Sequence, residues 1–323
     1  MAFPDLTDRK ILYELDIDAR QSNSQIAKKI GTSKEVVNYR VNRLIEKGII
    51  NYFHTIIDSG KLGFTLYRIF IKYHNLAKEK EQKIYNYLKS RVGWFVSVRG
   101  EWDMNIAVFK KRVSEFQEFW EDFINHFGNI IEKHQQSIIP SMWHYRKGYL
   151  LYDNKDTSVY DFYGKNEVTE HKLDNIDKKI LQILVNNARM TTIDIAERIK
   201  TTEMVVRYRI KKLEESKIIL NYRAFVNVSL LGYRYFKLHF QLAKADTETI
   251  KKIRSFMHHN PNIVHGNTAI GGWDLEMDVQ FKTNEELYNL IDSFREKFPK
   301  HIKNYEFMEY IKEYKFEYLP KLS

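Results

Sequence analysis

The sequence contains the same pattern twice, and this internal repeat constrains the fold more than any other feature. The segment VVNYRVNRL at residues 36–44 returns as VVRYRIKKL at residues 205–213. Matched residues before these segments, such as Ile11 and Ile180, are separated by the same offset of 169 positions. Self-similarity at a fixed offset over many positions is typical of a duplicated unit. We therefore expect two copies of one fold, each of about 150 residues.

Each copy begins with helical periodicity. Three apolar stripes at helical spacing follow one another in the first copy, at Ile11-Leu12-Leu15, Ile26-Ala27-Ile30 and Val37-Val41-Leu44. Polar turn residues separate the stripes, and Ser33 and its counterpart Thr202 are good N-caps for the third helix. Three short helices with a tight turn between the last two predict a helix-turn-helix unit.

The second part of each copy has the periodicity of strands. FKLHFQLA at 236–243 and DLEMDVQF at 274–281 alternate apolar and polar residues, which predicts half-buried strands. The helical stretches are 78–91 and 114–127 in the first copy and 246–258 and 284–298 in the second. The order strand, helix, strand, strand, helix, strand predicts a ferredoxin-like βαββαβ domain.

The predicted fold class is therefore α+β, with two tandem copies of a helix-turn-helix domain followed by a ferredoxin-like domain. A polar stretch of low periodicity at 147–172 is the candidate linker, and its apolar residues predict that part of it packs. The predicted domains are helix-turn-helix 1–58, ferredoxin-like 59–146, linker 147–172, helix-turn-helix 173–228 and ferredoxin-like 229–323.

Composition limits the classes of function. The formal charge of +10 favours a polyanionic partner such as nucleic acid or an anionic membrane surface. Together with the two helix-turn-helix units, it makes double-stranded DNA the partner that we expect. The sequence has no cysteine, which excludes disulfides, thiolate zinc sites and a cysteine nucleophile. The N-terminus lacks the apolar core of a signal peptide, and no apolar run is long enough to span a membrane. We expect a soluble cytoplasmic protein with no membrane partner.

The third helix of each copy carries the candidate DNA contacts. Its apolar stripe leaves an opposite side on which Asn and Arg are suited to base edges, and Lys and Tyr to phosphates. The alternative is a solvated charged face. The candidate residues are Lys34, Asn38, Tyr39, Asn42, Arg43, Arg207, Tyr208, Lys211 and Lys212.

Arg40 and Arg209 lie beside the apolar stripe, not at the outer pole of the helix. Two roles are open for them. They contact phosphate, or they pair with an acidic residue of the first helix, such as Asp8 or Asp177.

A second motif, Gly-x-Trp-Asp, occurs as GEWDM at 100–104 and GGWDL at 271–275. Gly permits close approach of a ligand, Trp offers an apolar wall and Asp accepts hydrogen bonds from an ammonium group. The alternative is structural: the Asp caps backbone donors of a hairpin and the Trp fills core space.

The ordered set of motifs resembles the leucine-responsive/asparagine regulator (Lrp/AsnC) family of transcription regulators. The resemblance rests on LDNIDKKIL at 173–181, IAKKIGTSKEVVNYRVNRLIEKGII at 26–50 and the Gly-x-Trp-Asp turns, where the family usually has Gly-x-Tyr-Asp. The sequence departs from the family in having Ser216-Lys217 where a Gly is usual, and in carrying two units.

The resemblance implies a winged helix-turn-helix DNA-binding domain followed by a small-molecule-sensing domain that pairs through its sheet. It also implies that an amino acid or other small effector binds near the Gly-x-Trp-Asp turns. The candidate effector residues are Gly100, Trp102, Asp103, Gly271, Trp273 and Asp274.

We therefore expect a sequence-specific DNA-binding transcription regulator with two non-identical recognition helices, and neither an enzyme nor a cofactor-dependent protein. One alternative is an enzyme resembling siroheme decarboxylases, for which Arg99, His144 and Tyr145 are available. Another is a nonspecific DNA-architectural protein without an effector. The pattern His258-His259-x5-His265 lacks a completing carboxylate, so we interpret these residues as surface histidines and expect no metal.

The sequence leaves assembly open. The two sheets of one chain can pair with each other, because the linker is long enough to span the distance. Exchange between chains, giving a homodimer or a higher oligomer, is equally compatible with the pattern.

Overall fold

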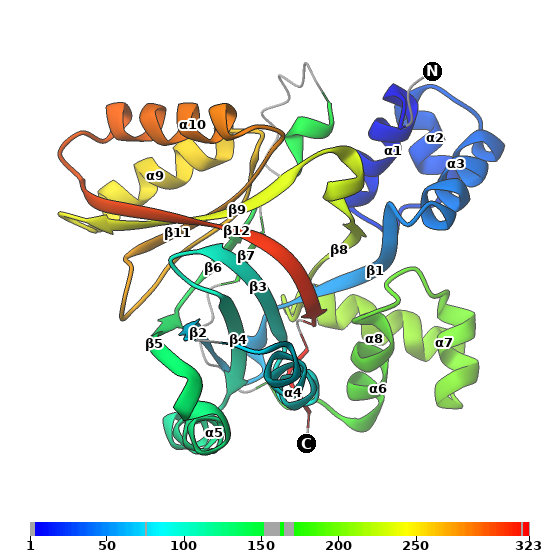
Figure 1. Ribbon diagram of the computed structural model, residues 1–323. Coiled ribbons are helices and arrows are strands. Elements are labelled where there is room, and N and C mark those ends of the chain that lie inside the picture. The colour runs from blue at the N-terminus through cyan, green and yellow to red at the C-terminus, as the bar shows by residue number, and fades with distance from the viewer. Residues whose placement is uncertain (1–3, 75, 152–161, 165–170, 318, 323) are drawn as a thin grey trace.

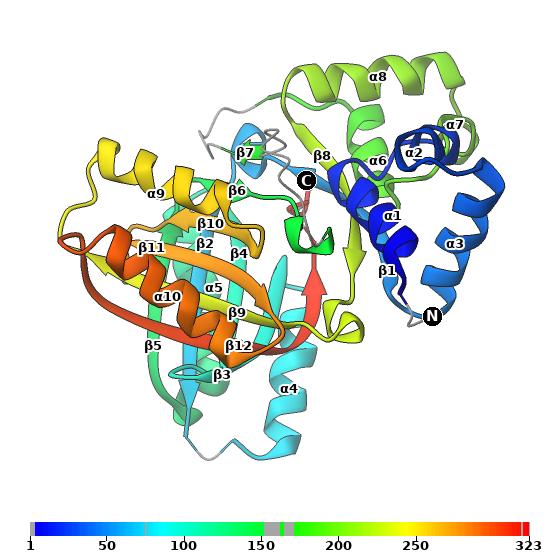
Figure 2. The same cartoon turned by 90° about the horizontal axis from the view of Figure 1, so that it is seen from above.

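In the computed structural model the two copies form one joined assembly. The structure describes residues 4–74, 76–151, 162–164, 171–317 and 319–322. The two helix-turn-helix domains lie next to each other on one side of the molecule, and the two α/β domains lie together on the other (Figure 1 and Figure 2).

Each helix-turn-helix domain consists of three helices followed by a strand. In the first copy these are α1 Leu6–Ile17, α2 Asn23–Ile30, α3 Lys34–Glu46 and β1 Ile50–Ile57. In the second they are α6 Asn175–Leu184, α7 Thr192–Ile199, α8 Glu203–Glu215 and β8 Ile219–Val226. Ser33 and Thr202 accept hydrogen bonds from the first turns of α3 and α8, which confirms both predicted N-caps.

The predicted strand and helix order is confirmed in both α/β domains. The first contains β2 Thr65–Tyr73, α4 Lys78–Lys89, β3 Trp94–Gly100, β4 Met104–Lys110, α5 Val113–Phe127 and β5 Ile131–Ile139. The second contains β9 Arg234–Leu242, α9 Thr247–His259, β10 Ile263–Thr268, β11 Leu275–Phe281, α10 Asn284–Lys297 and β12 Ile302–Phe316. Short 3-10 turns lie at Ser59–Lys61, Gly128–Ile130 and Val228–Leu231.

The helices of the α/β domains lie on the outside, and the two sheets face each other between them (Figure 1). The apolar residues of β9 and β11 pack against α9 and α10, while Phe70, Val98 and Met308 pack between the sheets. The prediction of half-buried strands was wrong for β9 and β11. Their polar alternate residues do not face solvent, because the sheet of the other copy covers them: Lys237 and His239 are both fully buried.

The two sheets are continuous through β12. The strand order is β5-β2-β4-β3-β12-β9-β11-β10-β6-β7, so one ten-stranded sheet runs through both copies. The first part of β12 pairs with β9 of its own copy, and its last part pairs with β3 of the other copy. In return β6, Met142–His144, leaves the first copy and pairs with β10 of the second. One chain therefore achieves the internal pairing that the sequence left open.

A second connection joins the helix-turn-helix domains. The strands β1 and β8 pair with each other in an antiparallel two-stranded ribbon. Equivalent arginines make reciprocal contacts beside it: Arg20 donates to the carbonyl of Ala188 at 2.6 Å, and Arg189 donates to the carbonyl of Ala19 at 2.9 Å. Because these contacts repeat at an offset of 169 positions, the chain is a pseudo-two-fold dimer of its own copies.

The predicted linker is partly packed. Residues 148–150 form a 3-10 turn, and Tyr149 and Leu150 are buried in the core of the first helix-turn-helix domain. Residues 162–164 form β7, which pairs with β6. The rest of the linker prediction, at 152–161 and 165–170, lies outside the described residues. Within the residues that the structure describes, no helix is long and apolar enough to cross a membrane.

Candidate nucleic-acid interface

The outer sides of α3 and α8 are largely exposed to solvent, although Asn38 of α3 accepts a hydrogen bond from Asn23 of α2 at 3.2 Å. Their apolar stripes are buried as predicted, at Val37, Val41, Leu44, Val206, Ile210 and Leu213. Eight of the nine candidate DNA contacts are exposed, namely Lys34, Asn38, Tyr39, Asn42, Arg207, Tyr208, Lys211 and Lys212. Tyr39 is 64% exposed and Tyr208 is 62% exposed. A tyrosine left in solvent at the same position of both helices marks a surface that is available to a partner.

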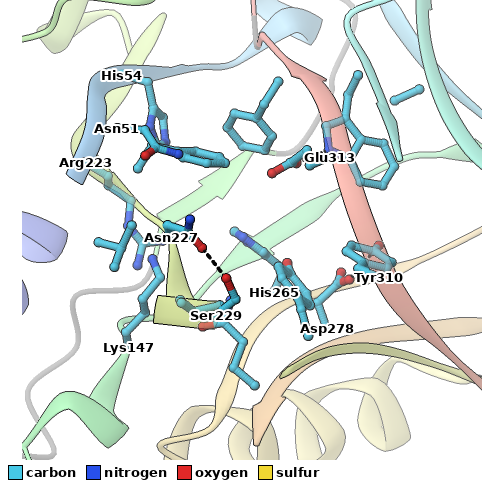
Figure 3. A pocket seen from close by; sticks show the side chains of 18 of the residues that line it. Asn51, His54, Lys147, Arg223, Asn227, Ser229, His265, Asp278, Tyr310 and Glu313 are labelled. Carbon is cyan, nitrogen blue, oxygen red and sulfur yellow. Dashed lines mark hydrogen bonds between the residues drawn. The ribbon is translucent and has the colours of Figure 1, made fainter. Parts of the chain in front are cut away.

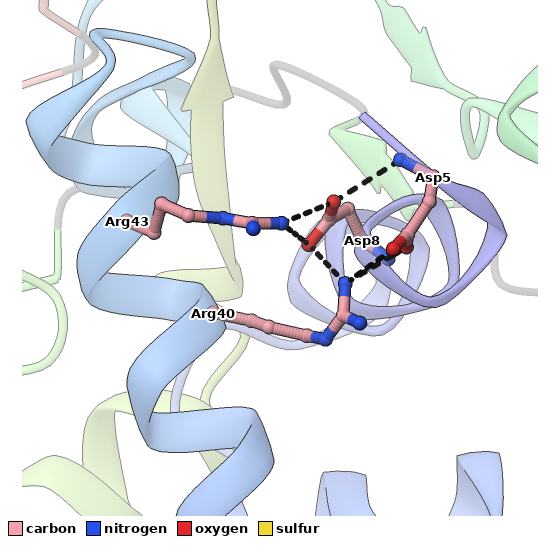
Figure 4. A network of polar contacts seen from close by, with 4 residues as sticks. All are labelled: Asp5, Asp8, Arg40 and Arg43. Atoms are coloured by element: carbon pink, nitrogen blue, oxygen red, sulfur yellow. Dashed lines mark hydrogen bonds and ion pairs between the residues drawn. The ribbon is translucent and has the colours of Figure 1, made fainter. Parts of the chain in front are cut away.

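The ninth candidate, Arg43, is already engaged (Figure 4). Its Nη2 lies 2.7 Å from Asp8 Oδ2, and the Asp8 carboxylate is fully buried. Arg40 Nη1 donates to the same carboxylate at 2.9 Å and to Asp5 at 2.8 Å. Arg40 therefore has the structural role that the sequence left open, and Arg43 shares it. This network fixes α3 against the N-terminus of α1.

The corresponding network in the second copy is looser. Arg209 lies 2.7 Å from Asp174 but 3.4 Å from Asp177, and Lys212 stands where the first copy has Arg43. On the exposed side of α8, Arg207 pairs with Glu203 at 2.5 Å. The contacts of Arg209 with Asp174 and Asp177 give it the same structural pairing role as Arg40.

The Gly-x-Trp-Asp turns have the bonds of the structural alternative. The Asp103 carboxylate accepts the backbone N–H of Tyr73 at 2.9 Å and the ammonium of Lys72 at 3.0 Å. The Asp274 carboxylate accepts the backbone N–H of Leu242 at 2.7 Å. Both carboxylates thus hold the end of a neighbouring strand. Effector binding at these turns stays a prediction.

The two turns lie at the junction between the copies. Trp102 is buried and donates to Glu306 of the other copy at 2.9 Å. Glu306 also contacts Nδ1 of His239 at 2.9 Å, and the ring of Trp273 stacks on His239 at 5.8 Å. Gly100 lies against the backbone of β12, and Gly271 lies against the backbone of β5. Each Gly-x-Trp-Asp turn therefore packs against the sheet of the other copy and contributes to the contact between the two sheets.

Two buried charge clusters were not predicted from the sequence. Between the sheets, Arg68 lies 2.6 Å from Glu276, which also accepts from Lys237 at 3.0 Å. Burial raises the pKa of Glu276, but the charges of Arg68 and Lys237 outweigh it and lower the pKa to about 2. Each cluster joins residues that are far apart in the chain, so neither leaves a local pattern.

The second cluster joins α1 to the ribbon. The Asp16 carboxylate binds Arg223 of β8, with Nε at 3.1 Å, and Lys147, with Nζ at 2.6 Å. Burial raises the pKa of Asp16, but Arg223 and Lys147 lower it to about 2. The repeat contained a signal for it: at the equivalent positions the other copy has Val185 and His54, so this ion pair exists on one side only.

The three residues considered for an enzyme are not brought together. Arg99 is exposed on β3, whereas His144 and Tyr145 are buried beside β10, four strands away in the sheet order. The interpretation of His265 as a surface residue was wrong: it is half-buried, and its ring lies 4.8 Å from that of His144. Among the described residues no group of three or more metal-ligating side chains occurs.

Comparison with known proteins agrees with this architecture. A family model described as winged helix-turn-helix DNA-binding matches residues 4–51 and 173–219, which are the two helix-turn-helix domains. The fold and its two exposed recognition helices define the class as a DNA-binding protein of the winged helix-turn-helix type.

Relatives define the family more closely. The chain is 33% identical over 120 residues to the HTH-type transcriptional regulator FL11 of Pyrococcus furiosus, covering 37% of this chain and 78% of that protein. It is 42% identical over 66 residues to the leucine-responsive regulatory protein of Rhizobium meliloti, covering 20% of this chain and 42% of that protein. The chain belongs to the Lrp/AsnC family of DNA-binding transcription regulators.

Across its whole length the chain is similar to a solved structure of another activity. The siroheme decarboxylase NirDL superposes over 96% of this chain and 92% of that chain, with a TM-score of 0.62 and 14% sequence identity. At this identity the likeness shows a shared two-copy fold and carries no activity over.

Proposed function

We propose that this protein binds double-stranded DNA in the cytoplasm through both α3 and α8 and thereby regulates transcription from asymmetric sites. One observation carries the proposal: a single chain presents two exposed recognition helices, held in one frame by the β1/β8 ribbon. A helix of this type enters the major groove, and a fixed frame sets the spacing of its half-sites.

The two helices have different roles in this proposal. Asn38 and Asn42 of α3 are exposed amides that can make paired hydrogen bonds to adenine edges. Arg207, Lys211 and Lys212 of α8 are exposed cations, which suit phosphates and bind with little regard to sequence. Lys34, Tyr39 and Tyr208 complete the contacts. Arg43 acts in this account through Asp8 as a positioning residue.

Matched variants of the two helices test this division of labour. With duplexes selected by the wild-type protein, the double variant Asn38→Ala/Asn42→Ala should lose about 2–5 kcal/mol of specific binding and keep its nonspecific binding. Lys211→Ala/Lys212→Ala should weaken binding to all duplexes and lower the slope of log Kd against log salt by about 2. Fluorescence anisotropy at several salt concentrations measures both. Wild-type affinity in both variants would refute the proposal.

Modulation by a small effector is part of the proposal. An amino acid near Gly100, Trp102, Asp103, Gly271, Trp273 and Asp274 would act at the junction between the copies, where both turns contact the other sheet. Measuring DNA affinity with and without each amino acid distinguishes an effector-dependent regulator from an architectural protein.

We also propose that the chain acts by binding and not by catalysis, which its transcription-regulator relatives support. The rival decarboxylase-like activity requires the protein to bind a tetrapyrrole. An absorbance titration with an iron tetrapyrrole should show no saturable spectral change. A saturable change at stoichiometric protein would favour the rival.

A further inference from the structure

A cavity of about 550 Å³ lies between the β1/β8 ribbon and the joined sheets (Figure 3). Residues of both copies line it, including Asn51 and His54 from β1, Asp278 from β11 and Tyr310 from β12. Asn51 and Ser229 are exposed, so the cavity opens to solvent. Its volume is in the range of small-molecule sites in proteins.

One wall of the cavity has excess positive charge. Arg223 and Lys147 line it on the same side (Figure 3). Both pair with the single carboxylate of Asp16, which lies behind this wall and is not a lining residue. Arg223 is 2% exposed and Asp16 is fully buried. Two cations against one carboxylate leave a net charge of about +1 in a poorly solvated place, where it acts strongly on a bound anion.

Two of the lining side chains also carry a buried polar atom that has no hydrogen-bond partner among the described residues. Arg68 is 4% exposed, and among the described residues its Nε has no hydrogen-bond partner. The buried Nδ1 of His265, another lining residue, likewise has none in the described part of the chain. Buried polar atoms of this kind normally have partners, and those here belong to side chains that line one space.

The rest of the cavity offers an aromatic surface. Trp94 and Tyr310 lie together with ring centroids 5.7 Å apart, and Phe225 and Phe316 with centroids 5.4 Å apart. These pairs come from both copies and from the ribbon as well as the sheet. Such a surface binds the flat or apolar part of a ligand.

We propose that this cavity binds a small organic monocarboxylate with an aromatic or apolar body, the carboxylate at the Arg223–Lys147 wall. One negative charge balances the net charge of that wall. The lining acids Asp278 and Glu309 are already paired with Lys237 and Arg234, so these pairs add no net positive charge for the further carboxylates of a polyanion such as a polycarboxylated tetrapyrrole. This site is distinct from the Gly-x-Trp-Asp turns.

A ligand in this cavity would touch the ribbon that carries both helix-turn-helix domains and the sheets that join the copies. Its binding free energy would therefore favour one orientation of the recognition helices over others. This coupling rests on the proposed DNA-binding function, whereas ligand binding itself does not.

The absence of native cysteine permits a direct test with a symmetrical disulfide probe, each half of which is an aromatic monocarboxylate. Ser229→Cys places one thiol at the cavity, and Ser293→Cys places one on the exposed face of α10 as the matched control. Each thiolate attacks the disulfide of 5,5′-dithiobis(2-nitrobenzoate) or of uncharged 4,4′-dithiodipyridine, forming a mixed disulfide and releasing a coloured thiol. For each position, the rate with the nitrobenzoate reagent is divided by the rate with the uncharged dipyridine reagent. This ratio should be about tenfold higher at residue 229 than at residue 293.

Lys147→Met in the Ser229→Cys background should abolish this preference while the protein stays folded, which circular dichroism checks. Equal rate ratios at residues 229 and 293, or a preference that survives Lys147→Met, would overturn the proposed site. No DNA is present, so this result is independent of the DNA-binding proposal.

A second measurement tests the coupling. The nitrobenzoate attached at residue 229 should change Kd for DNA by at least about fivefold, while the same group at residue 293 leaves it unchanged. Equal Kd values for the two labelled proteins would refute the coupling.

Discussion

At the scale of single residues, the buried carboxylate of Asp8 positions the first recognition helix. It is the common partner of Arg40 and Arg43, and its side chain is fully buried. The equivalent Asp177 is 10% exposed and lies 3.4 Å from its arginine. We therefore expect Asp8 and Asp177 to contribute different amounts to the free energy of unfolding of their domains.

Replacing Asp8 or Asp177 should destabilise the two helix-turn-helix domains by different amounts. Asp8→Asn should destabilise the first helix-turn-helix domain by about 2–3 kcal/mol, because it removes the buried carboxylate that Arg40 and Arg43 share, although Arg40 keeps its pair with Asp5. Asp177→Asn should cost the second domain about 1 kcal/mol or less. Hydrogen exchange of the α1, α3, α6 and α8 amides resolves the two domains in the intact chain. Equal losses of protection would contradict this assignment.

The buried imidazole of His144 makes stability depend on pH. Burial, followed by the charges of Arg223 and Lys147, lowers its pKa from the ordinary 6.5 to about 3. The unfolded chain therefore binds a proton between these pH values that the folded chain does not. The free energy of unfolding should fall as pH falls through this window, by about 1.4 kcal/mol per pH unit from this group alone.

His144→Gln should remove that part of the slope between about pH 4 and 6. Denaturant unfolding of wild type and variant across this range measures it. Other titrating groups cancel in the comparison, including Glu313, whose burial raises its pKa to about 7 and so contributes with the opposite sign. An unchanged slope would show that His144 takes up its proton in the folded protein.

At the scale of elements, the duplicated helix ends differ in strain. Gly31 and Gly48 follow α2 and α3 with φ of 73° and 69°, and the second copy has Lys200 and Lys217 there with φ of 58° and 59°. A side chain in this left-handed region costs about 1–2 kcal/mol. The second copy carries this cost twice.

Lys200→Gly and Lys217→Gly should each stabilise the second helix-turn-helix domain by roughly 0.5–1 kcal/mol, since both lysines are exposed and lose no packing. Gly31→Lys is the mirror control and should destabilise the first domain, although a Cβ at Gly31 would meet no atom within 4 Å. Thermal unfolding measures the shifts. Destabilisation by both glycine variants would contradict the strain.

The sequence predicts the elements well because their signals are local. The helices predicted at 78–91 and 284–298 span 78–89 and 284–297. The burial of the polar face of β9 and β11 could not be predicted. Polar residues such as Lys237 and His239 indicate a solvent-exposed face in the sequence, and only the three-dimensional structure shows that the sheet of the other copy covers them. The same limit applies to the cavity, whose lining comes from both copies and the linker.

At the scale of the whole molecule, the duplication turns a two-fold arrangement into a single chain with unequal halves. The reciprocal contacts of Arg20 and Arg189 preserve the symmetry. The Asp16–Arg223 pair and the divergent outer faces of α3 and α8 break it. A single chain of this kind presents two recognition helices whose exposed residues differ, and we propose that they bind different sequences.

Selection of random duplex DNA tests this central claim most directly. It compares the wild-type chain with a variant in which α8 carries the two exposed amides of α3 and its positioning arginine, Arg207→Asn/Lys211→Asn/Lys212→Arg. The wild type should select a site with two unlike halves, of which the half bound by α3 is the more sharply defined. The variant should select a site whose two halves are alike. Two identical half-sites selected by the wild type, or no change between the two proteins, would contradict the account.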